Sequence, residues 1–208
     1  MSSTEASRLT SPADVLSFWF GQERDGAWTA APETMRRWFM SDPAFDARIA
    51  ERFGATIDAA IRGDERLASW VGTPEGALAL VVVLDQFTRN TFRGTARMFA
   101  GDDRALKLAK RLVAAGVDQA LRPIERVFVY LPFEHSEALE DQVHSIELFE
   151  ANGAGMPADT FAAQSVEYAR KHEVIIRRFG RFPHRNKTLG RVSTAEELAF
   201  LETPGSSF

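Results

Sequence analysis

Apolar residues recur along this chain at the three- and four-residue spacing that is typical of α-helices. In the stretch 43–63, Phe45, Ile49, Phe53 and Ile57 share one helical face, with a proline at the start and a glycine at the end. No segment has the alternating pattern of a convincing strand. The pattern predicts an all-α protein of about eight or nine helices, joined as antiparallel pairs in a bundle or an α-solenoid. The expected helices cover residues 11–21, 32–39, 43–63, 75–87, 102–115, 124–130, 133–152, 158–179 and 194–201.

The segment 75–87 differs from the others because it is apolar all the way round. Every residue in 77–84 is hydrophobic, so the segment is expected to be buried on all sides, as a central helix or, less favoured, as a buried strand. Asp85 lies at the end of this segment, where its charge opposes the helix dipole and adjoins a packed interior. We therefore expect a cation beside Asp85, and Arg89 and Arg93 are the nearest candidates in the sequence.

Length, charge and composition indicate a soluble protein of one domain or of a tightly fused pair. We expect a flexible segment at 1–10, one helical domain over 11–203 and a loose tail at 204–208 in this chain of 208 residues. A net charge of -4 argues against nucleic acid as a partner. The lack of cysteine fits a reducing compartment, with the cytoplasm as the default. The N-terminus does not resemble a signal peptide, and no apolar stretch approaches the ~20 residues of a membrane span.

A similar phrase occurs twice, at 85–94 and 180–191, each time after an apolar segment. Each copy has an aromatic residue shortly before an Arg-Asn pair, with a further Arg and a Gly a few residues later. Arginine presents a rigid fork of donors suited to carboxylate or phosphate, and asparagine tolerates the left-handed backbone that ends helices. The phrases predict two helix-ending loops that could converge on one anionic ligand. The alternative is that the arginines only fix the helix ends, with Asp85 paired to its own phrase or to Arg181 or Arg185 of the other.

The histidines can be sorted by helix face at about 100° per residue. His135 falls on the same side as the apolar positions of the helix expected at 133–152, and His172 lies at the centre of the apolar face of 158–179. Two inward-facing histidines are either satisfied core residues or the lining of a common polar cavity. Asp141 and His144 are expected to point toward solvent, so their spacing does not predict a metal site.

Several longer phrases carry a family resemblance. LDQFTRNTFRGT (84–95), LPFEHSE (131–137), RFGRFPHRN (178–186) and LGRVSTAEELAFL (189–201), with VLSFWFG (15–21) at the front, resemble the bacterial and fungal domain-of-unknown-function family 924. The resemblance implies a tetratricopeptide-like α-α superhelix and brings no activity or catalytic residue. Thr88 stands where the first phrase is expected to have proline.

Two functions remain open from the sequence. The first is binding of a small anionic metabolite, a carboxylate or phosphate, with His135 or His172 transferring a proton if the protein is an enzyme. The second is a tetratricopeptide-like scaffold for a protein or peptide, without catalysis. No cofactor or metal is expected, and phosphate-binding loops, dinucleotide fingerprints and zinc-protease motifs are missing. The candidate ligand-binding residues are Asp85, Arg89, Asn90, Arg93, His135, His172, Arg181, His184, Arg185 and Asn186.

Overall fold

The computed structural model describes residues 9–21, 36–38 and 40–206, and all regular secondary structure within them is helical. The predicted all-α class is confirmed. Most of the predicted flexible segment 1–10 lies outside the described residues, as do residues 32 and 39 at the ends of the second expected helix. Of the tail, 207–208 lie outside them, and the Ser206 hydroxyl donates to the Leu201 carbonyl at 3.1 Å.

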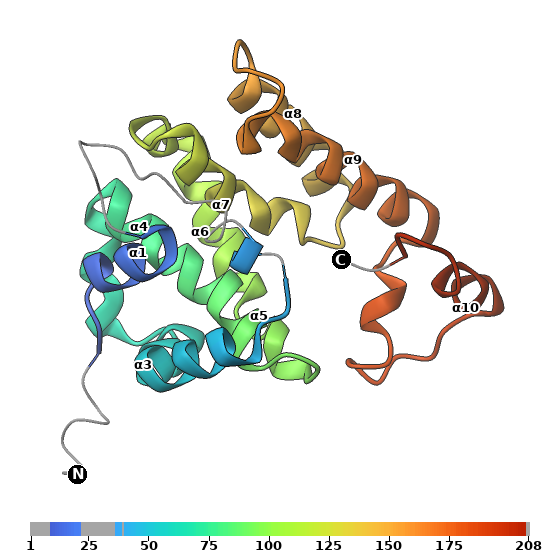
Figure 1. Cartoon of the computed structure of the whole chain (residues 1–208), viewed down its shortest axis with the longest axis horizontal. Helices are drawn as coiled ribbons and strands as arrows, with labels where there is room; N and C mark the ends of the chain where they lie inside the picture. The colour runs from blue at the N-terminus through green and yellow to red at the C-terminus, as the bar shows by residue number, and fades with distance from the viewer. Residues whose placement is uncertain (1–8, 22–35, 39, 207–208) are drawn as a thin grey trace. The chain divides into compact units, whose positions relative to one another are not determined.

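The chain divides into two compact units. The N-terminal unit comprises Met1–Arg93 and Arg97–Leu121, and the C-terminal unit comprises Gly94–Ala96 and Arg122–Phe208. The expectation of a single domain over 11–203 stays a prediction. Helices α1 (Pro12–Phe20), α3 (Pro43–Arg62), η1 (Glu65–Gly72), α4 (Pro74–Val81), η2 (Val82–Phe87), α5 (Thr88–Thr91), α6 (Asp102–Ala114) and η4 (Val117–Ala120) belong to the N-terminal unit, and η3 (Ala96–Phe99) begins at the boundary (Figure 1). Helices α7 (Pro123–Glu134), α8 (Leu139–Gly153), α9 (Phe161–Phe179), η5 (Pro183–Arg185) and α10 (Ala195–Leu201) belong to the C-terminal unit.

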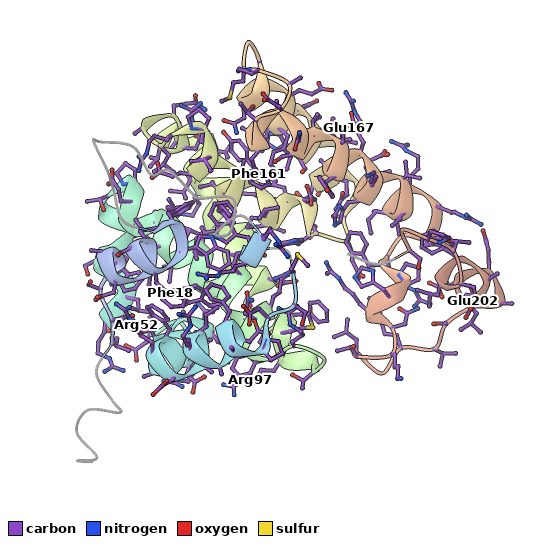
Figure 2. The ribbon with its side chains drawn as sticks, in the orientation of Figure 1. Phe18, Arg52, Arg97, Phe161, Glu167 and Glu202 are labelled. Carbon is purple, nitrogen blue, oxygen red and sulfur yellow. The ribbon has the colours of Figure 1, made fainter. Side chains whose placement is uncertain are left out.

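Capping and aromatic packing build the N-terminal unit. The Asp42 carboxylate accepts hydrogen bonds from the first amides of α3, and Gly63 ends that helix in the left-handed region with φ 72°. Phe53 of α3 packs against Phe87, with ring centroids 4.7 Å apart. Figure 2 shows Phe18 of α1 beside Arg52 of α3, whose guanidinium lies 5.8 Å from the ring centroid. These contacts place α1 and α3 around the helix that follows Pro74.

The buried segment that begins at Pro74 is helical, as predicted, but it does not end at Phe87. Helix α4 widens into a π-helix over Val82–Phe87 and continues as α5 to Thr91. The Thr88 hydroxyl donates to the Leu84 carbonyl at 2.7 Å, and Arg89 Nη1 donates to the Asp85 carbonyl at 2.8 Å. These side-chain bonds satisfy carbonyls in the wide turn. The prediction of a helix-ending loop at Arg89 and Asn90 was therefore wrong.

Two predicted boundaries in the C-terminal unit are also corrected. Helix α7 does not stop at Tyr130 but continues through Pro132 to Glu134, and α8 begins only at Leu139. An internal proline costs about 3 kcal/mol, which is offset here because Val127 to Glu134 are all buried. His135 is consequently the C-cap of α7 and does not lie on the face of a helix.

Helix α8 buries only part of the face expected from the sequence, which includes Gln142 and Phe149. Leu139 and Val143 are 39% and 40% exposed, whereas Asp141, expected in solvent, is buried and accepts from the Ser136 hydroxyl at 2.7 Å. The buried face carries polar groups, since Gln142 donates to the Glu134 carbonyl at 2.6 Å and Asn152 donates to the Pro123 carbonyl at 2.9 Å. Backbone carbonyls at the two ends of α7 thus accept hydrogen bonds from amide side chains on the inward face of α8.

Candidate functional site

The first Arg-Asn phrase forms an ion-pair network within the N-terminal unit. Arg89 Nη1 lies 3.0 Å from Asp85 Oδ1, and the guanidinium donates to both Asp102 oxygens at 2.8 and 3.0 Å. Burial acts to lower the pKa of Arg89, but the two carboxylates outweigh it and the pKa lies above its ordinary value. Asp85, which is fully buried, therefore has a cation from its own phrase.

The other two residues of this phrase bind helix α3. Asn90 Nδ2 donates to Asp46 Oδ1 at 2.7 Å, and Arg93 Nε donates to Asp46 Oδ2 at 2.9 Å. The four candidates Asp85, Arg89, Asn90 and Arg93 thus tie the wide turn to α6 and to α3. Their contacts are those of structural anchors.

In the second phrase, Arg181 and Asn186 hold the C-terminal helix. Helix α9 ends at Gly180 in the left-handed conformation, and Arg181 then binds both Glu197 oxygens at 2.6 and 2.7 Å. Asn186 donates to the Ser193 hydroxyl at 3.0 Å and to Glu197 at 3.3 Å. Hydrogen bonds from Arg181, together with those from the Thr194 amide and Asn186, lower the pKa of the Glu197 carboxyl to about 2.

The remaining candidates surround His172 in the middle of α9. His172 is 5% exposed, its Nδ1 lies 2.8 Å from the Tyr168 carbonyl, and Glu134 Oε1 lies 3.3 Å from the same nitrogen. Because a carbonyl only accepts, Nδ1 carries the proton and the lone pair of the neutral ring is on Nε2. The His135 ring centroid is 6.4 Å away. The two histidines predicted to share a polar region are therefore neighbours, brought there by the end of α7 and the middle of α9.

Phe182 of the second phrase packs beside His172. Its ring centroid is 5.5 Å from that of His172 and 5.6 Å from that of His184. The Arg185 guanidinium carbon sits 4.4 Å from the Phe182 ring centroid, and Arg185 is only 7% exposed. Two imidazoles and one guanidinium thus gather around the Phe182 ring, and the third imidazole, His135, lies beside His172. We call His135, His172, His184 and Arg185 the imidazole cluster.

Hydrogen bonds to the backbone fix Phe182 in place. Glu137 accepts from the Phe182 amide at 2.8 Å and from Arg191 at 2.7 and 2.9 Å, while Arg191 also donates to the Phe182 carbonyl at 3.0 Å. Burial acts to raise the pKa of Glu137, but these donors outweigh it and the pKa lies below its ordinary value. The carboxylate and guanidinium therefore position the ring around which the imidazole cluster is arranged.

Burial keeps the inner rings of the imidazole cluster uncharged at neutral pH. It lowers the pKa of His172 to about 3, with Arg185 and neighbouring imidazoles acting in the same direction and the Tyr168 carbonyl against it. It lowers the pKa of His184 to about 4, with Arg185 as the next cause. At pH 7 both rings are neutral, so each can accept a proton or a hydrogen bond.

Glu137 and Phe182 were missing from the sequence-based candidates, and Glu134 was considered only as a possible second carboxylate beside His135. All three lie in the phrases LPFEHSE and RFGRFPHRN, which was the available signal. Within the described ranges, no three His, Asp or Glu side chains are grouped so as to hold a metal ion. No helix in the described part of the chain is both long and apolar enough to cross a membrane.

The molecule is an all-α protein whose C-terminal unit gathers imidazole, carboxylate and guanidinium groups. The profile of DUF924, a family of bacterial proteins of unknown function, matches residues 15–205, and the chain belongs to this family. The chain is similar to the solved structure of a protein of unknown function from Agrobacterium tumefaciens, with 39% sequence identity and a TM-score of 0.75 over 92% of this chain and 96% of that one. No curated protein matches the sequence. The family resemblance found in the phrases is confirmed.

Proposed function

We propose that this protein binds a small anionic metabolite, through its carboxylate or phosphate group, at the imidazole cluster. The observation that carries the proposal is the buried guanidinium of Arg185 beside the rings of His172 and His184, both neutral at pH 7. A planar guanidinium presents a fork of donors that suits a carboxylate or a phosphate. Burial strengthens the attraction between such a guanidinium and an anion, because the effective dielectric constant is lower away from water.

The charges of the surrounding residues support this assignment. Arg181 and Arg191 are held by bidentate carboxylates, and Arg185 lies over the face of Phe182, where its charge also helps to lower the pKa of Glu137. The positive charge of Arg185 is felt at His172 and His184, because it helps to lower both pKa values. A bound anion would oppose that effect and raise both values. Near pH 5, binding would then be accompanied by proton uptake, most readily at the half-buried His184.

Proton transfer is a second candidate, favoured by the orientation of His172. Its Nδ1–H is committed to the Tyr168 carbonyl with Glu134 nearby, so the lone pair on Nε2 is the group that can accept a proton. The ring of His135 lies beside that of His172, with the two ring centroids 6.4 Å apart. Of the two histidines proposed for this role, the geometry therefore favours His172, with Arg185 holding the anionic substrate.

The test is a thermal-shift screen against small carboxylates and phosphate esters. A ligand at about 100 times its Kd stabilises the folded protein by about 2.7 kcal/mol, which corresponds to a rise in Tm of roughly 5 to 10 °C at this size. Arg185→Gln should abolish the shift, whereas Arg177→Gln, at an exposed position on α9, should retain it. Calorimetry in two buffers of different ionisation enthalpy then measures the proton uptake. An equal shift in the folded Arg185 variant, or no shift for any compound, would overturn the proposal.

A tetratricopeptide-like scaffold is the competing function, and one observation favours it. The packed helices α8 and α9 carry exposed apolar side chains, with Val143 at 40%, Tyr168 at 53% and Val174 at 61% exposure. On this alternative, the helix pair belongs to a tetratricopeptide-like arrangement and binds a peptide through its surface. Peptide-array binding that is lost in Val143→Ser but kept in Arg185→Gln would support the scaffold. The reverse pattern would support the ligand site.

A further inference from the structure

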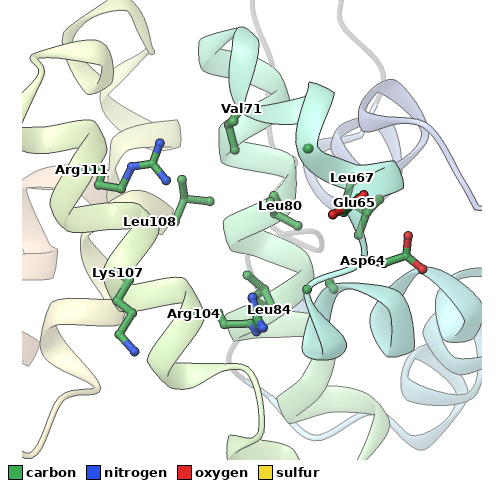
Figure 3. Close-up of a pocket in the computed structure, with 13 residues that line it drawn as sticks. Asp64, Glu65, Leu67, Val71, Leu80, Leu84, Arg104, Lys107, Leu108 and Arg111 are labelled. Atoms are coloured by element: carbon green, nitrogen blue, oxygen red, sulfur yellow. The ribbon is translucent and has the colours of Figure 1, made fainter.

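The N-terminal unit contains a groove that takes no part in the ion-pair network described above. It has a volume of about 320 Å³ and is half open to solvent. Figure 3 shows it between η1 and α6, with Leu80 and Leu84 between these two walls. Leu67, Val71 and Leu108 complete an apolar floor. A groove of this size and lining can hold the hydrocarbon part of a small molecule.

One wall of the groove carries three cations in a row. Arg104, Lys107 and Arg111 lie on α6 at a spacing of three and four residues and therefore share a face. Lys107 pairs with Asp103 at 2.9 Å on the exposed surface, and Arg104 donates to the Arg62 carbonyl at 3.3 Å. The Arg111 guanidinium has no ion pair or hydrogen bond within the described residues. The two arginines at the ends of the row are thus free of carboxylate partners in the described part of the chain.

The distance between these two arginines limits the kind of ligand. Arg104 and Arg111 are seven positions apart on α6, so their backbone positions lie about 10 Å apart along the helix axis, and a ligand that bridges the two side chains must span a distance of this order. An extended chain advances about 1.2 Å per bond, so a chain of eight carbons spans about 8 Å, and about 10 Å between its outermost carboxylate oxygens. Between the two cations the groove offers Leu80, Leu84 and Leu108. A ligand that matches this pattern has an anionic group at each end and methylenes between them.

We propose that this groove binds a linear aliphatic dicarboxylate of about eight carbons. One carboxylate pairs with Arg104 and the other with Arg111, while the methylene chain covers the leucines. A monocarboxylate of equal length satisfies one arginine only and places its methyl end beside the other cation. A four-carbon dicarboxylate is too short to reach both.

The opposite wall carries acidic residues, and their effect has to be included. Asp64 is neutralised by Arg66, whose Nη2 lies 2.7 Å from Asp64 Oδ2. Glu65 is exposed and has no ion pair in the described part of the chain. Its charge opposes an anionic ligand across a solvent-exposed gap, where screening keeps the effect small. Removing that charge should therefore strengthen ligand binding, whereas removing either arginine should weaken it.

Titration calorimetry at low ionic strength tests the proposal with suberate, octanoate and succinate as probes. Suberate should bind, and octanoate and succinate should each bind at least about fivefold more weakly. Arg104→Gln and Arg111→Gln should each weaken suberate binding about fivefold, and Glu65→Gln should strengthen it about twofold. Ala68→Phe, at an exposed lining position, should block the groove without removing a cation.

Two controls make the result specific to this groove. Lys110→Gln removes an exposed cation of α6 that does not line it and should leave the Kd for suberate unchanged. Arg185→Gln should also leave it unchanged, which separates this site from the imidazole cluster. Equal affinity for octanoate and suberate, equal loss in the Lys110 and Arg111 variants, or no binding of suberate at millimolar concentration by the folded protein would each overturn the proposal.

Discussion

The buried imidazole of His172 should make the C-terminal unit sensitive to mild acid. Its pKa is about 3 in the folded protein and about 6.5 when the chain is unfolded. Between these two values the unfolded chain binds a proton that the folded chain excludes. The free energy of unfolding therefore rises with pH in this window and falls as the solution is acidified from pH 7 toward pH 3.

The size of the effect follows from the two pKa values. At pH 7 the unfolded imidazole is mostly neutral, and at pH 5 it is almost fully protonated, so His172 accounts for a loss of about 2 kcal/mol between pH 7 and pH 5. His184, with a folded pKa of about 4, acts in the same direction, but its partial exposure reduces its share to about 1 kcal/mol. Glu197 contributes little above pH 5, because its stabilisation is lost only below its unfolded pKa of about 4.5.

The assay compares the wild type with His172→Phe, which keeps a buried ring but cannot take up a proton. Hydrogen exchange of α9 amides in increasing urea, at pH 7 and at pH 5, measures the free energy of unfolding in the C-terminal unit. All four tryptophans of the chain precede residue 94, so their emission follows the N-terminal unit as an internal reference. The pH-dependent loss should shrink by about 2 kcal/mol in His172→Phe. His144→Gln, which changes an exposed histidine of α8, is the matched control. It should still show the loss in the free energy of unfolding between pH 7 and pH 5 that is due to His172.

The reasoning would be refuted by an equal loss between pH 7 and pH 5 in the wild type and in His172→Phe. It would also be refuted by a histidine NMR titration in which the His172 ring takes up its proton near pH 6.5. Either result would mean that the Glu134 carboxylate or water stabilises the charged ring.

Three further predictions concern the anchors of the two units. In Gly101→Ala the added methyl group would clash with the Leu84 carbonyl oxygen, so urea unfolding followed by tryptophan emission should show a loss of about 1 to 3 kcal/mol. Asp85→Asn removes one of the two carboxylates from a buried guanidinium, and the same measurement should show a loss of about 2 to 3 kcal/mol. Arg181→Gln removes the largest cause of the low pKa of Glu197, so a carboxyl NMR titration should find this pKa raised from about 2 toward its ordinary value.

Each of these outcomes has a clear opposite. Unchanged stability in Gly101→Ala would mean that the backbone at the start of α6 moves away from the wide turn. A change of less than about 0.5 kcal/mol in Asp85→Asn would mean that water already solvates this carboxylate. A pKa of Glu197 that stays near 2 without Arg181 would assign its stabilisation to the Thr194 amide and Asn186 instead.

The sequence predicted those parts of the fold that depend on local chemistry. The cap at Asp42 and the left-handed glycine at position 63 set the ends of α3 as expected, because caps and stop signals act within one turn. The position of His172 on the buried face of α9 also followed from helical periodicity. The same periodicity carries no information on which residues meet His172 in space, so Phe182 was not among the candidates.

Features that depend on distant partners could not be read in this way. Helix α7 passes through Pro132 because its end is buried. The amide side chains of α8 lie inward because they donate hydrogen bonds to backbone carbonyls of α7. The pairing of Arg93 with Asp46 joins residues that are 47 positions apart, so a phrase that suggested ligand capture proved to contact α3. The contact of Glu134 with His172 likewise depends on the packing of α7 against α9.

The wide turn at Val82–Phe87 also affects how the chain tolerates changes in length. A π turn holds one residue more than a regular helical turn, so deleting one residue there can restore an uninterrupted α-helix. Because the wide turn absorbs this extra residue, the residues that follow would keep their orientation. Arg89 would still face Asp102, and Asn90 would still face Asp46. A deletion in the regular part of the helix would instead rotate everything that follows by about 100° and break these attachments to α6 and α3, so the wide turn is the place in this helix where the loss of one residue is best tolerated.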